Sequence, residues 1–544
     1  MKNKIKKSVF FIASFVLAFG INSCTNLDET LYSELSKDNF YNSRREVVQA
    51  VLRGFTHMQA WIAPTGQSGY YYHSELSADQ QAWPQKGRHG YDNGDHFRQH
   101  YHSWTDNEGR MRSCWSLLWS GLGYINAAIS DLETIDYASI GITDTEMASY
   151  LAELYVMRAF HYMKIMEFWG NVPIITTVGE PLNPPTQPKS EIFAFIKKEL
   201  EEHVPKLVPY SSEMIGRISQ TAGYAMLAEL YLNAEYFIGT PMFDECIATC
   251  DRIISGQAGG LDGGKPSLEQ NINTCFSNTN QKAKEALFQI AYSRKGGFTF
   301  GWDGFMMGYS NMSTALNVGY SGWNAFVVTP NAFSAYADND LRKKEWFLFG
   351  PQYRYGTDEP ILGTEEWNGK PLVYVNAIRR ESEGDYTSEG GMDQGEENSG
   401  ARFHKYKSGT LADDNYWENH YMLYRLTEIY YNKAEAIMRK NGGTANQEAV
   451  DLINTCYKRN FPAGDWDKVK YTTSTLTMDE LLKERGREFI FEGKRRMDII
   501  RFGFFTTGTW WDHKPTNDST RELYPIPNTQ MGANPNLVQN PGYN

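Results

Sequence analysis

Two glycine-rich segments of the chain bring tryptophan together with amide and charged side chains. The first reads SELSADQQAWPQKGRHGYDNGDHF, and the second reads GGFTFGWDGFMMGYSNMSTALNVGYSGWNAF. Aromatic rings can stack on the apolar C–H faces of sugar rings, while amides, carboxylates and guanidinium groups bond the hydroxyls. The candidate stacking residues are Trp83, Trp302, Trp323 and Tyr320, and the candidate hydroxyl partners are Asp79, Arg88 and Asn324. The alternative is that each tryptophan packs its own loop against the protein.

A second candidate for chemistry is the charged segment LLKERGREFIFEGKRRMDIIRFG near the C-terminus. It carries Glu484, Glu488, Glu492 and Asp498 among several arginines. Paired carboxylates serve as acid and base in glycosidases. The interpretation we favour is that these carboxylates form ion pairs that tie the segment to neighbouring helices.

Two further patterns are weaker. His96, His100 and His102 lie close together in DHFRQHYH, but no HExxH motif or helically spaced carboxylate completes a catalytic zinc site. The segment GGLDGGKP resembles a phosphate-binding loop, yet Pro266 stands where Ser or Thr is needed and no strand precedes it. We therefore expect packed histidines, no metal site, no phosphate loop and no cofactor.

The N-terminus is predicted to be a signal peptide spanning residues 1–23. Four lysines precede the apolar run from Val9 to Gly20, which is too short to cross a bilayer. The run ends in GINSC, which resembles a bacterial lipoprotein cleavage box, although Asn22 is unusual there. We expect Cys24 to be lipidated and to anchor the mature chain. The alternative is an ordinary secretory cleavage site.

Charge and composition narrow the class of protein. Without the four leader lysines, 49 basic residues face 65 acidic ones, which argues against nucleic acid as a partner. Aromatic residues reach 14% of the chain, including 34 Tyr and 14 Trp, and there are 47 Gly. The cysteines are scattered and form no disulfide framework. Cys246 and Cys250 lie one helical turn apart, and we interpret them as small buried residues.

Hydrophobic periodicity predicts a mainly helical fold with long irregular tracts. The predicted helices are 111–135, 143–169, 191–203, 220–237, 243–254, 416–439, 446–459 and 477–502, with a strand at 286–291. The irregular tracts are 61–109, 256–280 and 293–413. Loops of this length are usually functional, so we expect a helical body that displays them.

One sequence element recurs along the helical segments. LAELY stands at 151–155 and at 227–231, and LTEIY stands at 426–430. Each copy fills the first helix of a predicted helix pair, and the spacing resembles degenerate tetratricopeptide units. Chance repetition of helix-forming residues stays open as the alternative.

Taken in order, these segments resemble the SusD/RagB family of outer-membrane lipoproteins of Bacteroidetes-type bacteria. The likeness covers nearly the whole mature chain. It rests on LDETLYSEL, FYNSRREVVQAVLRGF, RAFHYMKIMEFWGNVPII, GRISQTAGYAMLAELYLNAEYF, YRLTEIYYNKAEAIMR, ERGREFIFEGKRRMDIIRFG and LYPIPNTQMGANPNLVQNPGY. The departures are Asn22, Tyr424 and Thr427.

The resemblance implies four tetratricopeptide-like helix pairs that form a right-handed superhelical scaffold with large irregular loops and few strands. It divides the mature chain into an N-terminal region, 24–280, and a C-terminal region, 281–544. It implies a non-catalytic, surface-exposed glycan-binding protein that pairs with a SusC-type TonB-dependent transporter in the outer membrane. Both tryptophan-rich loops match the regions that carry the family's glycan platform.

Two alternatives to this function stay open. The first is a secreted glycoside hydrolase with its carboxylates in the irregular tracts, and the second is a transporter lid that takes peptides. The three indoles favour an extended sugar chain, such as a β-linked plant polysaccharide.

Overall fold

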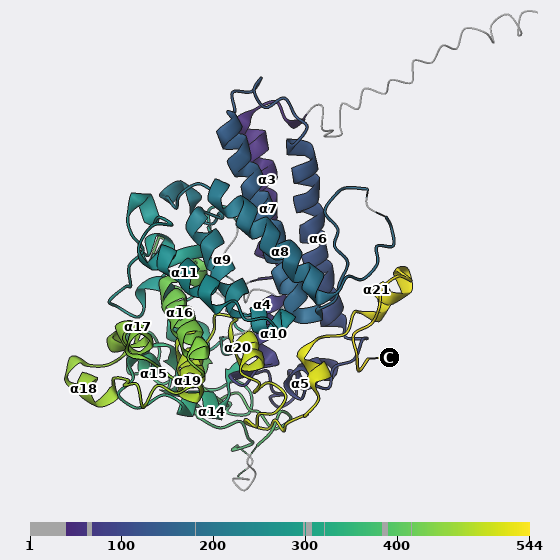
Figure 1. Cartoon of the computed structure of the whole chain (residues 1–544). Helices are drawn as coiled ribbons and strands as arrows, with labels where there is room; N and C mark the ends of the chain where they lie inside the picture. Colours follow the sequence, from purple (N-terminus) through teal and green to yellow (C-terminus); the bar gives the residue numbers. More distant parts are fainter. Residues whose placement is uncertain are drawn as a thin grey trace, which may run out of the picture.

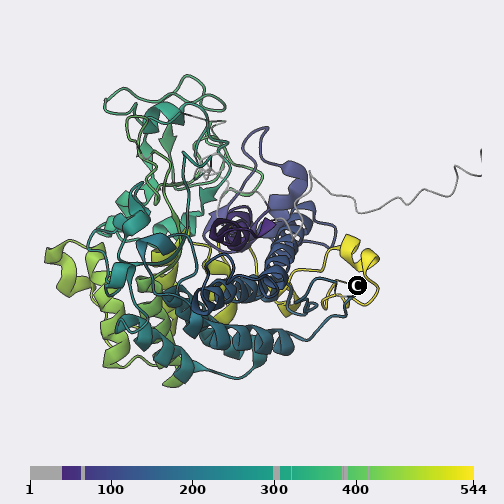
Figure 2. The same ribbon diagram turned by 90° about the horizontal axis from the view of Figure 1, so that it is seen from above.

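Long helices build one part of the molecule, and irregular loops build a lobe that stands out from it (Figures 1 and 2). The computed structural model describes residues 40–62, 68–179, 181–297, 300, 307–319, 321–382, 384, 390–414 and 416–543. The lobe is drawn in teal and green in Figure 2 and belongs to the chain between α11 and α16. The mainly helical fold class is thus confirmed.

The long helices pack side by side in an array. They are α3 (Arg44–Met58), α6 (Gly109–Leu132), α7 (Asp144–Trp169), α8 (Lys189–His203), α9 (Gln220–Leu232), α11 (Phe243–Ile254), α16 (Leu426–Lys440) and α17 (Gln447–Tyr457). α7 packs against α8, α9 against α11, and α16 against α17. The three copies of the repeat therefore lie in the first helices of three pairs, as predicted. α11 also packs against α16, so helices distant in sequence share the array.

Local signals in the sequence fix the ends of α7. The Thr143 hydroxyl accepts a hydrogen bond from the Glu146 backbone N–H, and the Glu146 carboxylate accepts one from the Thr143 backbone. This capping box satisfies amides that the first helical turn leaves free. At the other end Gly170 adopts φ +64°, a conformation that favours glycine, and the helix ends there as expected.

Three predicted helices are interrupted or replaced in part by a strand in the structure, and the bounds of four others differ by one to three residues. The segment 416–439 begins as strand β8 (Tyr421–Arg425), because its backbone pairs with β2 (Ala286–Ile290). The segment 477–502 divides into α19 (Met478–Phe489) and α20 (Arg495–Arg501). Between them Phe491, at φ +68°, is fully buried and meets Phe403 with ring centroids 4.5 Å apart. The segment 220–237 divides at Asn233 into α9 and α10 (Ala234–Ile238).

The tracts expected to be irregular contain short elements. The short helices of the chain also include α4 (Tyr70–Leu76), α5 (Asp95–His100), α13 (Met312–Leu316), α14 (Pro330–Ser334), α15 (Leu341–Glu345), α18 (Trp466–Val469) and α21 (Asn528–Ala533). The short strands are β1 (Gln81–Ala82), β3 (Val327–Val328), β4 (Phe347–Leu348), β5 (Gly350–Pro351), β6 (Val373–Tyr374) and β7 (Arg402–Phe403). They form the antiparallel pairs β1–β3, β4–β7 and β5–β6, which hold the loops together.

The charged C-terminal segment is buried among its ion-pair partners, so the structural interpretation is confirmed. Glu484, Glu488, Glu492 and Asp498 are each at most 4% exposed. Their ion pairs include Glu484–Arg342 at 2.8 Å, Glu488–Arg425 at 2.8 Å, Glu492–Lys405 at 2.6 Å and Asp498–Arg485 at 2.9 Å. These contacts connect α19 and the turn after it to α15, β8 and the loop lobe, and they connect α20 to α19.

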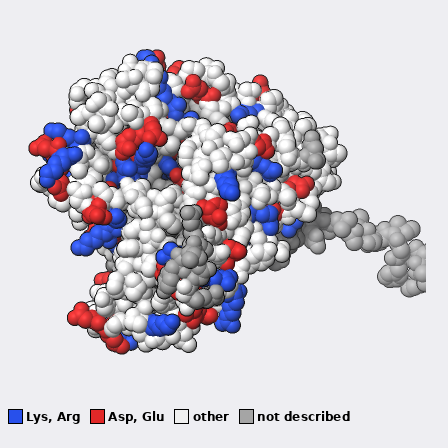
Figure 3. Space-filling model, turned by 90° about the horizontal axis from the view of Figure 1, so that it is seen from below, with Lys and Arg blue, Asp and Glu red and all other residues white. Residues whose placement is uncertain are grey.

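The described cysteines are buried and unbridged, and Cys246 donates to the carbonyl of Ala228, as expected for a small packed residue. Among the described residues, no helix is both long enough and apolar enough to cross a bilayer. On the face shown in Figure 3, acidic and basic side chains are interspersed, and wide areas carry neither. That face presents mixed charge.

Candidate functional site

Three of the residues selected from the sequence line one hollow. Trp83, Trp323 and Asn324 surround a space of about 240 Å³. The other lining residues are Pro84, Lys86, His89, Gly90, Asp92 and Tyr309. They come from the two glycine-rich segments that the sequence singled out, residues 74–97 and 296–326 of the chain. The hollow is therefore a candidate sugar-binding site.

A short strand pair explains how the two segments meet. β1 ends at Ala82, immediately before Trp83, and β3 begins at Val327, just after Asn324. The strands pair antiparallel, with Ala82 opposite Val327. Because this register fixes both loops at the same end of the pair, Trp83 and Trp323 reach the same space.

Trp323 presents its indole to solvent. Its side chain belongs to the exposed large hydrophobic residues, with 57% of its surface accessible. The loop behind it is close-packed, because a Cβ at Gly322 would collide with the backbone carbonyl of Gly308. The Asn324 backbone N–H also donates to the Met307 carbonyl at 2.8 Å. A flat, exposed ring on an anchored loop suits stacking on a sugar.

Trp83 forms a wall of the hollow and is only 4% exposed. Its ring lies parallel to that of His96, with centroids 3.8 Å apart and planes 9° apart. Phe326 and Tyr72 meet the indole at 5.3 Å and 6.4 Å. Gly90, at φ +82°, lets the loop cross the indole, since a Cβ there would lie 3.2 Å from the Trp83 Nε1. Trp83 therefore shapes the hollow, and little of its ring is open to a ligand.

Asn324 holds the loop in place. Its Oδ1 accepts from Arg402 Nε at 3.0 Å and Nη2 at 2.8 Å, and its Nδ2 donates to the Glu397 carbonyl at 3.1 Å. The buried Lys86 ammonium donates to the Asn324 carbonyl at 2.6 Å and to the Ala325 carbonyl at 2.7 Å. Burial holds the pKa of Lys86 well below its usual range. These bonds position Trp323 and leave the Asn324 amide engaged inside the protein.

The other predicted hydroxyl partners lie in different environments. Arg88 adjoins the lining residue His89 but does not itself line the hollow, and 77% of its side chain is exposed, with a contact of 3.5 Å to Glu365. Asp79 is 7% exposed, and both of its carboxylate oxygens accept from Arg495, at 2.7 and 2.8 Å. Asp79 thus joins the β1 region to α20 and does not line the hollow. Trp302 and Tyr320 lie outside the described residues.

Among the lining residues that were not selected from the sequence, His89, Tyr309 and Asp92 have side chains that could contact a ligand. The rings of His89 and Tyr309 meet edge to face at 5.9 Å, and Asp92 accepts from His96 Nε2 at 3.2 Å and from Arg110 at 3.1 Å. Burial raises the pKa of the Tyr309 hydroxyl. All three lie inside the two glycine-rich segments. The sequence therefore indicated where they lie but not how their side chains are oriented.

The neighbouring histidines are packed against protein groups. His96 Nδ1 lies 2.8 Å from the Tyr72 hydroxyl, His100 Nε2 lies 3.1 Å from the Trp511 carbonyl, and His102 Nε2 lies 2.8 Å from the Ser77 carbonyl. Within the described ranges, no group of three or more His, Cys, Asp or Glu side chains is placed to hold a metal ion.

Acidification is expected to destabilise the wall of the hollow. Burial is the main cause that lowers the pKa of His96 to about 4, from the 6.5 of a free imidazole. Between pH 6.5 and 4 the unfolded chain therefore binds this proton and the folded chain does not. The His96 contribution is fully present above pH 6.5 and falls by up to about 1.4 kcal/mol per pH unit below it.

Urea unfolding from pH 8 to pH 4.5 measures this effect. His96→Gln keeps a hydrogen-bonding side chain and should give a shallower loss of stability than the wild type. The difference at pH 8 reports the packing cost alone, because both proteins are uncharged at this position there. Parallel pH profiles for the two proteins would contradict the assignment.

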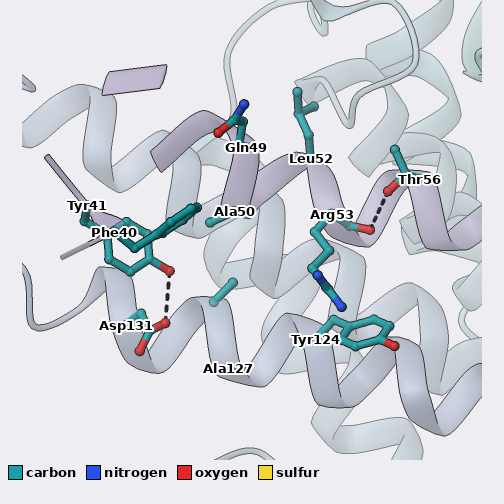
Figure 4. Close-up of a pocket in the computed structure, with 11 residues that line it drawn as sticks. Phe40, Tyr41, Gln49, Ala50, Leu52, Arg53, Thr56, Tyr124, Ala127 and Asp131 are labelled. Carbon is teal, nitrogen blue, oxygen red and sulfur yellow. Dashed lines mark hydrogen bonds between the residues drawn. The ribbon is translucent and has the colours of Figure 1, made fainter. Parts of the chain in front are cut away.

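A larger hollow of about 710 Å³ lies between α3 and α6 (Figure 4). Several of its polar groups are engaged with one another. The Tyr41 hydroxyl donates to Asp131 at 2.9 Å, and the Arg53 guanidinium lies 4.2 Å from the centre of the Tyr124 ring. The remaining lining is mostly apolar, and so this hollow offers fewer groups for sugar hydroxyls than the one beside Trp323.

Two models of known protein families match parts of the chain. The model described as "SusD family" matches residues 284–543, and the model described as "Starch-binding associating with outer membrane" matches residues 27–232. The chain is 26% identical to the starch-binding protein SusD of Bacteroides thetaiotaomicron over 587 residues, which cover all of both chains. It is 23% identical to a SusD-like protein of Formosa agariphila, over 76% of this chain and 73% of the relative.

Solved structures share the fold. A laminarin-binding SusD-like protein superposes with a TM-score of 0.69 at 18% identity, covering 92% of this chain and all of that one. Surface glycan-binding protein A of Bacteroides thetaiotaomicron, in complex with laminarihexaose, superposes with a TM-score of 0.67 at 20% identity. The match covers 92% of this chain and 99% of that protein.

Proposed function

Because the chain belongs to the SusD family, we propose that it is a non-catalytic glycan-binding lipoprotein of the outer membrane. It captures a polysaccharide or oligosaccharide at the cell surface in the hollow beside Trp323 and delivers it to a SusC-type TonB-dependent transporter. The observation that carries the proposal is the exposed Trp323 indole above a hollow rimmed by His89, Tyr309 and Asp92. Stacking on the indole supplies affinity, and the rim supplies hydrogen bonds.

The relatives support a sugar ligand. One is named for binding starch, and one solved structure holds laminarihexaose. Starch and laminarin are neutral glucans, so neutral glucans are the first ligands to examine. The rim of the hollow suits them, because the partly exposed His89 ring and Asp92 carboxylate can bond sugar hydroxyls and need no ligand charge.

The ion pairs of the carboxylates in the charged C-terminal segment favour a binding role over hydrolysis. A retaining glycosidase needs two carboxyl groups about 5–5.5 Å apart that both reach the substrate. Glu484, Glu488 and Glu492 are buried and occupied by arginine and lysine partners. Their ion pairs give them a structural role, and this weakens the case for a hydrolase built on this segment.

Affinity electrophoresis of the mature protein against a panel of neutral and acidic polysaccharides tests the proposal. We expect retarded migration in at least one neutral glucan gel and no release of oligosaccharides on prolonged incubation. Migration unaffected by every polysaccharide, or steady release of products, would contradict it. A tagged protein should also co-purify with a TonB-dependent barrel from detergent-solubilised outer membranes.

The anchor gives a separate prediction. Cys24→Ala should move the protein from the outer-membrane fraction to the soluble fraction, because a lipid on this residue is the proposed attachment. Fractionation with incorporation of labelled palmitate measures the effect, and a Cys456→Ala variant controls for thiol loss at a buried position. Unchanged membrane attachment of the Cys24 variant would exclude a lipid at this residue.

A further inference from the structure

A second polar hollow lies at another edge of the molecule. It has a volume of about 640 Å³ and opens between the tract 265–270 and the C-terminal end of α17 together with α18. The side chains relevant to binding are Tyr430, Trp466, Lys265, Lys458 and Arg459. In Figure 1, α18 lies far from α5, which directly follows the Trp83 segment. The two hollows are therefore separate.

The walls of this hollow are held together by a buried guanidinium. Arg459 donates to the Glu269 carbonyl at 2.8 Å, to Glu285 at 2.5 and 3.1 Å, and to the Thr427 hydroxyl at 2.9 Å. The Glu269 backbone N–H donates in turn to Glu285 at 3.0 Å, and Ser267 donates to the Lys284 carbonyl at 3.2 Å. The tract is thus fixed on the helical body, and the hollow exists before any ligand arrives.

The hollow combines aromatic rings with exposed lysine side chains. Trp466 and Tyr430 are half-buried, so part of each ring faces the space. Lys458 is exposed, and its Nζ lies 5.8 Å from the centre of the Trp466 ring. In the part of the chain that the structure describes, neither Lys458 nor Lys265 has a carboxylate within 4.0 Å.

The two lysines belong to an acidic chain with a formal net charge of −12. Neighbouring lysines on the same stretch do find partners, since Lys468 pairs with Asp465 at 3.3 Å and Lys470 pairs with Asp467 at 2.8 Å. The acidic lining residue Glu269 is also engaged, because its Oε1 accepts from the Lys284 backbone N–H at 2.8 Å. Among the described residues, Lys265 and Lys458 thus line the same hollow as Trp466, and neither has a carboxylate within 4.0 Å.

We propose that this hollow is a second carbohydrate site, which takes a sugar residue bearing a carboxylate. The ring of a uronic acid stacks on Trp466, and its carboxylate accepts charge-assisted hydrogen bonds from Lys265 and Lys458. This goes beyond the proposed function, because it assigns an acidic ligand to a site remote from Trp323. The two sites together would let one protein hold a mixed neutral and acidic polysaccharide at two points.

Calorimetric titration of the mature chain with trigalacturonate, and with neutral galactotriose of the same length, tests the site. We expect trigalacturonate to bind and galactotriose to bind at least about tenfold more weakly. The double variant Lys265→Ala/Lys458→Ala and the variant Trp466→Ala should each weaken trigalacturonate binding at least about tenfold. Raising the salt concentration should also weaken it, because exposed charges are screened.

Matched controls separate this site from the first one. Lys468→Ala/Lys470→Ala removes two lysines from the same surface, and Trp323→Ala removes the indole of the first hollow, so both should leave trigalacturonate affinity unchanged. Both substituted lysines of the site are exposed, so the double variant should fold normally. No binding by the wild type, equal affinity for galactotriose, or full affinity in Trp466→Ala would each overturn the proposal. These outcomes are independent of the neutral glucan panel.

Discussion

Arg425→Ala should be among the most destabilising substitutions in this chain, with a loss of about 3–5 kcal/mol in the free energy of unfolding. Arg425 is 1% exposed and donates to three carboxylates. It reaches Glu492 at 2.8 and 2.9 Å, Glu285 at 2.8 Å and Glu488 at 2.8 Å. Removing the guanidinium leaves these buried negative charges close together without their common partner, and that is the source of the loss.

The cationic partners also control the protonation of the carboxylates. Arg425 and Arg459 overcome the effect of burial and lower the pKa of Glu488 to about 2. They lower the pKa of Glu285 further still. In Arg425→Ala we expect the pKa values of these carboxyl groups to rise. The variant should therefore lose less stability on acidification than the wild type does.

Chemical unfolding of Arg425→Ala, Arg425→Lys and Arg354→Ala measures the effect. Arg425→Lys keeps the charge but loses the forked geometry, so it should fall between Arg425→Ala and the wild type. Arg354 pairs with Glu359 on the surface, where both side chains are about half exposed, and its removal should cost less than about 1 kcal/mol. Equal costs for Arg425→Ala and Arg354→Ala would refute the role of the buried cluster.

Trp83→Ala should damage both stability and ligand binding. The indole is 4% exposed and packs against His96, Phe326 and Tyr72. Truncating a buried tryptophan to alanine typically costs about 3–5 kcal/mol, because a cavity replaces the ring. Since the ring also forms a wall of the hollow, the loop that carries Gly90 should lose its support and the binding groups their alignment.

Thermal unfolding and polysaccharide binding of Trp83→Ala and Trp83→Phe separate these two effects. Phe retains a ring against His96 and should recover most of the stability and part of the affinity. If Trp83→Ala unfolded at the wild-type temperature, the indole could not be the packed wall described above. Trp323→Ala is the matched control, because the same truncation at an exposed ring should leave the unfolding temperature nearly unchanged.

The helical body could be predicted from the sequence, because the sequence features that specify helices lie close together along the chain. The predicted helix 143–169 agrees with α7 to within one residue, and the structure shows that a capping box at Thr143 and Glu146 and the glycine at Gly170 set its ends. The repeated LAELY segments correctly marked the first helices of pairs, because the helical periodicity of 3.6 residues can be detected from residues that are close together in the sequence. The same signal failed at 421–425, where pairing with β2 makes an apolar run a strand.

The candidate site could be predicted only in part, because its geometry depends on residues that are far apart in the sequence. The two glycine-rich segments were identified, but the pairing of Ala82 with Val327 that joins them has no local signature. The sequence also did not indicate the direction in which the polar side chains of these loops point. Asp79 meets Arg495, 416 residues away, and Asn324 meets Arg402, 78 residues away. The sequence therefore located the loops, whereas the long-range pairs decided which side chains stay open to a ligand.

In the proposed function, the exposed Trp323 indole binds the sugar. Calorimetric titration of the wild type, Trp323→Ala and Trp466→Ala, with an oligosaccharide of the best neutral glucan from the panel, tests it most directly. We predict that Trp323→Ala binds at least about tenfold more weakly, equivalent to about 1.4 kcal/mol, with an unchanged unfolding temperature. Trp466→Ala should bind this neutral ligand as the wild type does. Wild-type affinity in Trp323→Ala would contradict the account.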